Sequence, residues 1–511
     1  MSSKTPGYLT DIDYTYGYYA ELNPQRVSFA FLNAGLVPPS VGVACELGFG
    51  QGMSTNLHAA ASVVRWSGTD FNPSQASFAQ EMARVAGSGA ELFDEAFDEF
   101  CNRADLPDFD YIGLHGIWSW ISDENRAVIV EFIRRKLKVG GVLYVSYNTQ
   151  PGWAAMVPMR DLLMQHAEVL GSDGAGIVNR IESALTFAEQ LLATNPHYAN
   201  ANPQIAARLK QIKEQDRNYI AHEYFNKEWE PMSFAKMAQW LSPAKLQWAC
   251  SANLLDAIDT VNLTPQQQNF LAQIPDRMFR QTTRDFCVNQ FFRKDYWVKG
   301  ARQLTQLEQI ERLRVQRVVL IRPRDQVTLK VMGHAGEATL QESVYGPILD
   351  LLANHKPKTL GNLEQKLADK ALNFGQILEA ITVLIGIGAV MPAQDEAVIA
   401  QTKPSTDRLN SYLMSKGRSH YDLKFLACPV TGGGIAVARF DQLFLRAKQQ
   451  GHATPKEWAN FVWSLLKQQG HRIIKDNKAL ETDEEHLLEL QGEADSFANV
   501  RLPLLKALQI A

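Results

Sequence analysis

The chain has 511 residues, and its 51 lysines and arginines nearly balance its 55 aspartates and glutamates, which leaves a formal net charge of −4. This length predicts several domains, and the 46% hydrophobic fraction is enough for several buried cores. Without a basic excess, the chain does not have the composition of a dedicated nucleic-acid binder. The five cysteines form no C-x-x-C pair, which argues against a zinc ribbon or a disulfide framework and favours a reducing compartment.

No targeting or membrane segment is evident. The N-terminus lacks the apolar core of a signal peptide. The longest mostly apolar stretch, residues 380–393, is shorter than the about 20 residues that a membrane span needs. We therefore expect a cytoplasmic protein with no membrane partner. The sequence leaves the oligomeric state open, a homodimer included.

Residues 1–40 combine a cluster of tyrosines with one helical pattern. The helix is expected over residues 27–36, and Pro38 and Pro39 end it. The tyrosines either pack against the following domain or cover a cofactor or substrate, so this segment is predicted to be an aromatic and helical lid. They are Tyr14, Tyr16, Tyr18 and Tyr19.

Residues 41–165 alternate between strand and helix patterns. This alternation predicts an α/β domain with a doubly wound parallel sheet, and such sheets bind ligands at the carboxyl ends of their strands. The predicted strands are 41–47, 64–69, 91–93, 110–114 and 142–147, and the predicted helices are 55–64, 73–85 and 124–137.

Three further regions are predicted beyond the sheet. Residues 166–310 have helical periodicity, strongest over 177–193 and 205–219, and are expected to form a helical regulatory or middle domain. Residues 311–400 are expected to be winged-helix-like, because a hairpin of 315–320 and 327–331 precedes helices near 344–353 and 374–385. Residues 401–511 are expected to form a C-terminal α+β domain, in which three successive glycines from Gly432 make a sharp turn.

The strongest local motif is the sequence ELGFGQG, residues 46–52, between the first predicted strand and helix. Its glycines, Gly48, Gly50 and Gly52, allow a tight turn and a close approach of the backbone to a ligand. A dinucleotide site of the form G-x-G-x-x-G is excluded because Met53 and Thr55 occupy the positions of its third glycine. A P-loop is excluded because no Gly-Lys-Ser/Thr follows.

Two acidic residues support a nucleoside-bearing ligand at this turn. Asp70 ends the second strand, where a carboxylate can accept hydrogen bonds from both ribose hydroxyls. Glu46 immediately precedes the glycines and faces the same crevice. The pattern E-x-G-x-G-x-G matches motif I of class I methyltransferases, which bind S-adenosylmethionine (SAM). We therefore expect SAM as the cofactor, S-adenosylhomocysteine (AdoHcy) as the product, and no metal.

Several further segments carry a more specific likeness. Together they resemble a branch of bacterial class I SAM-dependent methyltransferases that carry a methyltransferase regulatory domain, and the likeness extends over about residues 14–510. The best-understood members of that branch are protein lysine methyltransferases that act on bacterial surface proteins. The resemblance therefore implies a Rossmann-like methyltransferase sheet, a protein substrate and a lysine acceptor. The segments are 109–120 (FDYIGLHGIWSW), 144–153 (YVSYNTQPGW), 222–225 (HEYF), 284–286 (RDF), 291–293 (FFR) and 429–432 (PVTG).

The resemblance also implies roles for the residues around the cofactor. The three glycines would pass the methionine part of SAM, and Glu46 would help to hold its amino group. Phe71, next to Asp70, is also expected among the cofactor-binding residues. The adenine position at the third strand falls on Glu95 or Ala96, depending on the alignment. If it is Ala96, backbone amides near Phe97 would contact the adenine edge.

The candidate catalytic residues follow strands four and five. His115 could accept a proton or contact the cofactor, or it could be a hydrogen-bonded structural histidine. The tryptophans could form an aromatic wall for an ammonium group or belong to the core. Asn148 could orient the acceptor nitrogen or serve only the turn before Pro151. The full set is His115, Trp118, Trp120, Tyr147, Asn148 and Trp153.

Two other functions are weighed beside protein lysine methylation. A small-molecule methyltransferase could use the same domain, and a closed pocket would favour it. A SAM-binding regulatory protein could use the winged-helix-like part to bind a protein or nucleic acid, with residues 312–317 as its basic segment. An adenine-N6 target is disfavoured, because His115 and its neighbours replace the Asp/Asn-Pro-Pro-Tyr/Phe motif of those enzymes.

Overall fold

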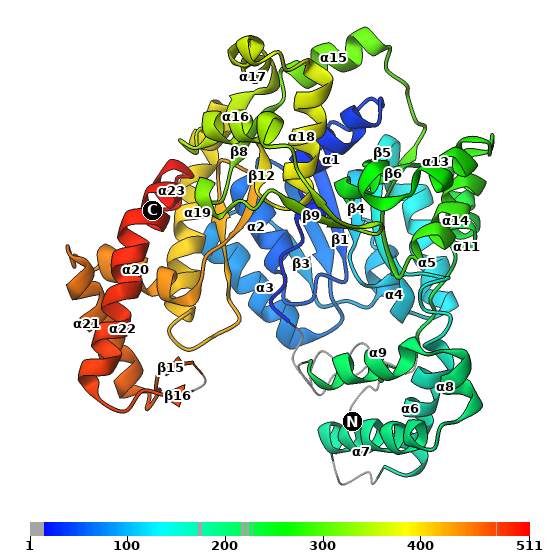
Figure 1. The fold of residues 1–511 in the computed structure, drawn as a ribbon, viewed down its shortest axis with the longest axis horizontal. Coiled ribbons are helices and arrows are strands. Elements are labelled where there is room, and N and C mark those ends of the chain that lie inside the picture. Colours follow the sequence, from blue (N-terminus) through cyan, green and yellow to red (C-terminus); the bar gives the residue numbers. More distant parts are fainter. Residues whose placement is uncertain (1–14, 172–175, 216–219, 221–223, 227, 477) are drawn as a thin grey trace.

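A computed structural model of the chain describes residues 15–171, 176–215, 220, 224–226, 228–476 and 478–511. At its centre lies a seven-stranded sheet with the order β3-β2-β1-β4-β5-β7-β6 (Figure 1). The strands are β1 (Val43–Leu47), β2 (Arg65–Thr69), β3 (Glu91–Phe93), β4 (Phe109–Leu114), β5 (Leu137–Asn148), β6 (Leu246–Ser251) and β7 (Phe292–Lys299).

The first five strands are parallel, and the strand order reverses between β1 and β4. This reversal creates the crevice in which doubly wound sheets bind ligands. The predicted α/β architecture is therefore confirmed. The connecting helices are α2 (Met53–Ala61), α3 (Pro73–Ala86), α4 (Phe97–Cys101) and α5 (Asp123–Lys136).

The interval 166–310 is not only helical, because it also supplies β6 and β7. Strand β7 runs antiparallel to both β5 and β6 and completes the sheet. The successive charges of Arg293, Lys294 and Asp295 conceal β7 in the sequence, since consecutive charged residues rarely lie in a buried strand. Arg293 and Asp295 are nevertheless buried, and they pair with each other.

Between β5 and these two strands, the sequence forms a helical lobe. This lobe has its own apolar core. Figure 1 shows it projecting from one end of the sheet. Its helices are α6 (Val157–Val169), α7 (Gly176–Ala193), α8 (His197–Ala201) and α9 (Gln204–Lys213); the end of the helix predicted over 205–219 falls outside the described residues. The chain then returns through α11 (Phe234–Leu241), α12 (Asp259–Asn262), α13 (Pro265–Ala272) and α14 (Arg277–Val288).

The expected hairpin between residues 315–320 and 327–331 is wrong. Strand β8 (Arg317–Leu320) pairs instead with β11 (Lys358–Thr359) and β12 (Val390–Ala393). Strand β9 (Lys330–Gly333) pairs with β10 (Gly336–Thr339), because the short turn between two glycines brings these neighbours together. The helices beside the three-stranded sheet of β8, β11 and β12 are α15 (Gln306–Arg314), α16 (Glu342–Leu352), α17 (Leu360–Lys366) and α18 (Phe374–Gly386).

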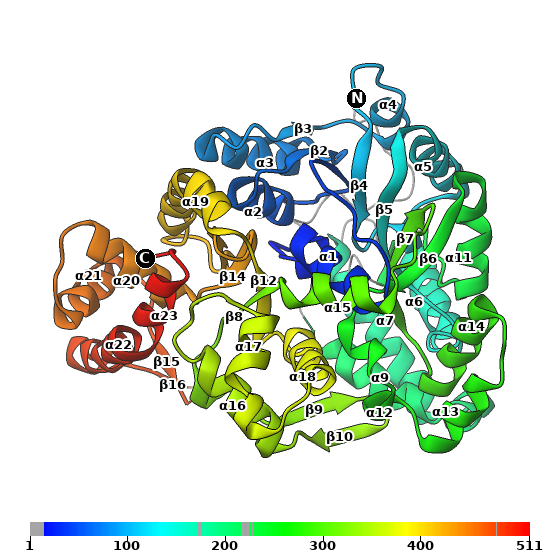
Figure 2. The ribbon, with the colours of Figure 1, turned by 90° about the horizontal axis from the view of Figure 1, so that it is seen from above.

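The C-terminal region packs directly on the helices of the central sheet. Helix α19 (Glu396–Lys416), which crosses the expected boundary at residue 400, lies against α2 and α3 (Figure 2). The hairpin of β13 (Phe425–Cys428) and β14 (Gly433–Ala436) covers another side of α2. Every residue of α2 is consequently buried. The remaining elements are α20 (Arg439–Gln449), α21 (Pro455–Gln468), β15 (Ile474–Lys475), β16 (Lys478–Ala479), α22 (Asp483–Ser496) and α23 (Leu502–Ala507).

The N-terminal segment lies against this same group of helices. It leads into α1 (Pro24–Asn33), whose N-cap Asn23 accepts a hydrogen bond from the backbone of Gln25 and donates one to the carbonyl of Thr431. Tyr16 packs edge-on against Phe78 of α3. Tyr14 lies outside the described residues. Among the helices that the structure describes, none has the length and apolarity to cross a bilayer.

Candidate functional site

The turn between β1 and α2 has the conformation that its glycines predict. Gly48, Gly50 and Gly52 have φ angles of 74°, 57° and 70°, in the left-handed region. A Cβ atom at Gly48 would lie 2.4 Å from Ile117, and one at Gly52 would lie 2.4 Å from Ala79, so neither position accepts a larger residue. Helix α2 begins directly after this turn, and the N–H groups at a helix N-terminus favour an anionic ligand group.

Asp70 is anchored on this turn from the end of β2. Its Oδ2 accepts a hydrogen bond from the backbone N–H of Gly50 at 2.9 Å, and its Oδ1 accepts one from Asn72 at 3.0 Å. Burial raises the pKa of Asp70 to about 6, against the lowering effect of these two hydrogen bonds. Each carboxylate oxygen retains a lone pair, so Asp70 can still accept two ligand hydroxyls.

A cavity of about 180 Å³ opens beside Asp70 at the carboxyl ends of β1, β2 and β3. Five residues proposed for the cofactor line it together, namely Gly48, Asp70, Phe71, Ala96 and Phe97. Both alternatives for the adenine position, Glu95 and Ala96, belong to its wall, so that choice stays open. The other lining residues are Asp98, Ile117, Trp120, Ile121, Ser122, Asn125 and Glu228. Of these residues, only Trp120 is among the candidates predicted from the sequence.

Glu46 lies behind the turn and outside the lining of this cavity. Its carboxyl group is buried and accepts a hydrogen bond from the hydroxyl of Thr55 on α2. Burial raises the pKa of Glu46 to about 8; the Thr55 hydrogen bond lowers it and the charge of Asp70 raises it further. Glu46 is therefore mostly protonated at neutral pH in this structure, and a nearby ligand cation would favour its ionised form.

His115, at the end of β4, is enclosed by residues from three segments. Its ring stacks on Tyr19 with centroids 3.4 Å apart, and its Nδ1 lies 2.8 Å from the hydroxyl of Tyr144. Glu21 and Lys294 form an ion pair of 2.6 Å nearby. Burial lowers the pKa of His115 to about 3, with Glu21 raising it and Lys294 lowering it. The imidazole is therefore neutral near pH 7.

Three other candidates, Trp118, Tyr147 and Trp153, are buried. The indole N–H of Trp118 points to the sulfur of Met232 at 3.2 Å. The hydroxyl of Tyr147 donates to Oδ2 of Asp295 at 3.0 Å. Trp153 packs edge-on against Trp229 in the core of the helical lobe, with ring centroids 5.1 Å apart. None of the three lines the cavity beside Asp70, and their catalytic roles stay predictions.

Asn148 differs from these residues because part of its side chain has no partner. Its backbone is fixed by the hydroxyl of Ser119 at 2.8 Å and by the backbone N–H of Met232 at 3.0 Å. Its Nδ2 is buried and makes no hydrogen bond within the part of the chain that the structure describes. Burial of an amide N–H donor without a partner costs free energy of folding unless a ligand or a water molecule accepts its hydrogen bond. Asn148 therefore remains a candidate for contact with an acceptor.

Comparisons with known proteins agree with this architecture. Residues 216–299 match the family model "Predicted methyltransferase regulatory domain", so the regulatory domain expected from the sequence is confirmed. "Uncharacterized protein sll1526" from Synechocystis is 42% identical over 510 residues, which cover 99% of both chains. The chain belongs to the family of sll1526. This sll1526-family chain is also 25% identical over 283 residues to "Uncharacterized protein RP789" from Rickettsia prowazekii, covering 54% of this chain and 49% of that protein.

Among solved structures, the sll1526-family chain is similar to PKMT2 from Rickettsia typhi in complex with AdoHcy. The TM-score is 0.70 at 19% identity, and the match covers 98% of this chain and 100% of PKMT2. A second structure of PKMT2 gives a TM-score of 0.67 at 17% identity, with the same coverage. The central sheet with its appended regions therefore has the class I methyltransferase fold.

Proposed function

We propose that this protein is a SAM-dependent methyltransferase whose acceptor is a lysine side chain of a protein. The observation that carries the proposal is the joint placement of the glycine turn, the anchored carboxylate of Asp70 and the adjacent cavity at the switch point of the sheet. A class I fold alone admits many chemistries, but this site has the features that an adenosyl ligand requires. The complex of PKMT2 with AdoHcy supports the same ligand.

The residues present fit SAM. Asp70 offers its free lone pairs to the ribose, while Phe71, Ala96 and Phe97 line the cavity on the adenine side. The glycine turn leaves room for the methionine part, and the first turn of α2 favours its carboxylate. Glu46 is a buried carboxyl group that no ion pair joins to a described residue, and the amino group of SAM would ionise it. When bound, SAM supplies an electrophilic methyl group on its sulfonium.

The chain's own residues would prepare the acceptor nitrogen. A lysine must lose its proton before it can take a methyl group, and aromatic, apolar surroundings lower the pKa of an ammonium group. Tyr19, His115 and Tyr144 form such a wall at the end of β4. With its low pKa, His115 would orient the acceptor by a hydrogen bond and would not store the proton. Asn148 would complete the orientation from the end of β5.

The likeness to protein lysine methyltransferases supports a polypeptide substrate, and the fold shared with PKMT2 over nearly the whole of both chains is consistent with it. We propose that the helical lobe and the regions beyond residue 300 orient that polypeptide. The division into a lid, a middle domain, a winged-helix-like domain and a C-terminal domain is part of the same proposal, and so is a cytoplasmic location.

The test combines cofactor titration with methyl transfer. Calorimetric titration with SAM and AdoHcy should show binding that Asp70→Ala weakens. Labelled SAM should then place methyl groups in protein bands of a lysate from the source organism, and hydrolysis should release methyl-lysine. Label confined to small molecules would replace the proposed substrate, and binding without any transfer would indicate a SAM-responsive binding protein. No binding of SAM would overturn the proposal.

A further inference from the structure

A second and larger cavity lies beside β6 and β7, whereas the Asp70 cavity lies beside β1, β2 and β3. It has a volume of about 380 Å³, a size typical of small-molecule sites. Its walls come from the ends of β6 and β7, the segment between β6 and α12, helix α14 and one face of α1. All of its lining except Ala30, Asn33 and Ala34 falls within residues 216–299.

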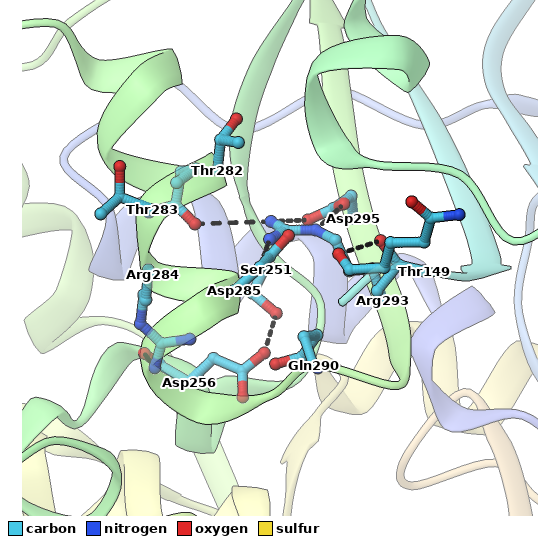
Figure 3. Close-up of polar contacts among 12 residues, drawn as sticks. Thr149, Ser251, Asp256, Thr282, Thr283, Arg284, Asp285, Gln290, Arg293 and Asp295 are labelled. Atoms are coloured by element: carbon cyan, nitrogen blue, oxygen red, sulfur yellow. Dashed lines mark hydrogen bonds and ion pairs between the residues drawn. The ribbon is translucent and has the colours of Figure 1, made fainter. Parts of the chain in front are cut away.

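One wall is a network of buried charges on β7 and α14. Arg293 donates from Nε and Nη2 to the two carboxylate oxygens of Asp295, at 2.8 and 2.9 Å, and from Nη1 to Asp285 at 2.5 Å (Figure 3). Trp248 donates its indole N–H to Asp295 at 2.8 Å. One guanidinium group thus joins two carboxylates and holds α14 to β7, while Oδ2 of Asp285 is buried without a hydrogen bond from a described residue.

Two other arginines of the cavity donate to backbone carbonyls, and the one ion pair that either of them makes with a described residue is long, at 4.0 Å. Arg280 and Arg284 lie one turn apart on α14, and both line the cavity. Arg284 is only 7% exposed; it donates to the carbonyl of Asp256 at 2.9 Å, and its Nε is 4.0 Å from the carboxylate of Asp259. Arg280 donates to the carbonyl of Ile274, and no ion pair joins it to another described residue. Both guanidinium groups retain N–H donors suited to a carboxylate.

Other residues of the lining supply acceptors. Gln290 is 8% exposed, and its Nε2 donates to the carbonyl of Phe292 at 2.7 Å, which fixes the orientation of the amide. Its Oε1 is buried and accepts no hydrogen bond from any described residue. The carboxylate of Asp256 accepts from Ser251 at 2.7 Å and from Asn253 at 2.9 Å and keeps a lone pair on each oxygen. Figure 3 shows Arg284, Asp256 and Gln290 together beside the Arg293 network.

We propose that this cavity binds the α-amino carboxylate group of a small ligand. The carboxylate would lie on Arg280 and Arg284, and the ammonium group would donate to Oε1 of Gln290 and to Asp256. Apolar residues of the lining, including Leu254 and Leu271, leave space for the ligand's remaining carbon chain. Free l-amino acids and AdoHcy both carry this group. The proposal does not depend on the methyl acceptor.

Calorimetric titration of the full chain with individual l-amino acids and with AdoHcy tests the proposal. At least one of these probes should bind in this cavity with one-to-one stoichiometry, and Arg284→Gln should weaken that binding by about tenfold or more. Amino acid binding should persist when AdoHcy saturates the Asp70 site. If AdoHcy itself is the ligand, a second equivalent should bind and should survive Asp70→Ala.

Matched probes and variants separate this site from unspecific binding. The corresponding amine and the corresponding carboxylic acid each lack half of the recognised group and should bind at least about tenfold more weakly. Gln290→Leu and Arg280→Gln should each weaken binding as well, and they decide the question if Arg284→Gln does not fold. Arg312→Gln, on exposed α15, should change nothing. Failure of every probe, or equal binding to these variants, would overturn the proposal.

Discussion

The ring of Tyr19 lies on the imidazole of His115, with the two centroids 3.4 Å apart and the planes inclined by 19°. The backbone N–H of Tyr19 also donates to the hydroxyl of Ser54 in the first turn of α2, at 2.9 Å. One residue of the N-terminal segment thus contacts both the end of β4 and the helix that follows the glycine turn. The segment is therefore part of the wall at which we place the methyl acceptor.

Replacing Tyr19 should affect catalysis more than cofactor binding. Tyr19→Ala removes the aromatic face from His115, so we expect turnover to fall by about tenfold or more, because a small misplacement of reacting groups is costly. Tyr19→Phe keeps the stacked ring and should retain most of the activity. Steady-state kinetics with labelled SAM would measure both variants. The matched control is Tyr16→Ala, which removes the contact with Phe78 instead. Unchanged turnover in Tyr19→Ala would show that Tyr19 is not part of the acceptor site.

The carboxylate of Asp70 should contribute to SAM affinity. We expect Asp70→Ala to weaken SAM binding by about 1–3 kcal/mol, the usual loss for hydrogen bonds to a charged group. Asp70→Asn keeps the shape of the side chain but lacks one acceptor oxygen, so its SAM binding should be weakened less than that of Asp70→Ala. Calorimetry at fixed pH gives both values, with the exposed Asp105→Asn as control. Wild-type affinity in both Asp70 variants would rule out ribose binding at this position.

Glu46 should make the protein less stable as the pH rises. Its pKa in the folded chain is about 8, above the ordinary value of 4.5, so its stabilising contribution is full below the ordinary value and is lost as the pH rises through about 8. The free energy of unfolding of the wild type should therefore fall, relative to that of Glu46→Gln, between about pH 5 and about pH 9. Denaturant titrations across this range measure the difference; parallel curves would contradict the expectation.

Proton release on SAM binding gives a second measure of Glu46. If the amino group of SAM ionises this carboxyl group, binding at neutral pH should release a proton. Calorimetric enthalpies measured in buffers of different ionisation heat report that proton directly. The release should be smaller in Glu46→Gln and unchanged in a variant of the exposed Glu131. Equal release from the wild type and Glu46→Gln would place the amino group elsewhere.

The Arg293 network should dominate the stability of the β7 region. Arg293→Met leaves the carboxylates of Asp285 and Asp295 buried without their partner, and the free energy of unfolding should fall by about 3–5 kcal/mol. Chemical denaturation followed by far-ultraviolet circular dichroism measures it. Arg134→Met, on the exposed face of α5, removes a surface ion pair with Glu131 and should have little effect. A small loss in Arg293→Met would mean that the buried carboxylates take up protons at low cost.

Local patterns predicted the first half of the sheet well. Strands β1, β2 and β3 could be predicted because each is followed by a glycine or an acidic residue. They also pair with one another, and only short segments of the sequence separate them. Strand β7 was missed because its burial depends on partners elsewhere: Arg293 needs Asp285, and the neighbours of β7 in the sheet are β5 and β6. The pairing of β8 with β12 was missed for the same reason.

The candidate site shows the same division. Gly48 belongs to the glycine motif and Asp70 ends the strand that follows it, so local patterns identified both residues. Ile117, Ser122 and Asn125 line the same cavity but have no distinctive pattern, and Glu228 reaches it from beyond the helical lobe. The alternatives for the tyrosines were packing or a lid, and the contacts of Tyr16 with Phe78 and of Tyr19 with His115 leave room for both.

The antiparallel pairing of β5 with β7 has a consequence for biosynthesis. Residues 149–291 separate the two strands, so the open edge of β5 has no partner while the ribosome adds the helical lobe and helices α11 to α14. An unpaired edge invites association with other chains, and distant pairing slows folding. The nascent protein must keep that edge covered until β7 has emerged from the exit tunnel. The speed of translation through the helical lobe should therefore influence how much of the protein reaches the native state.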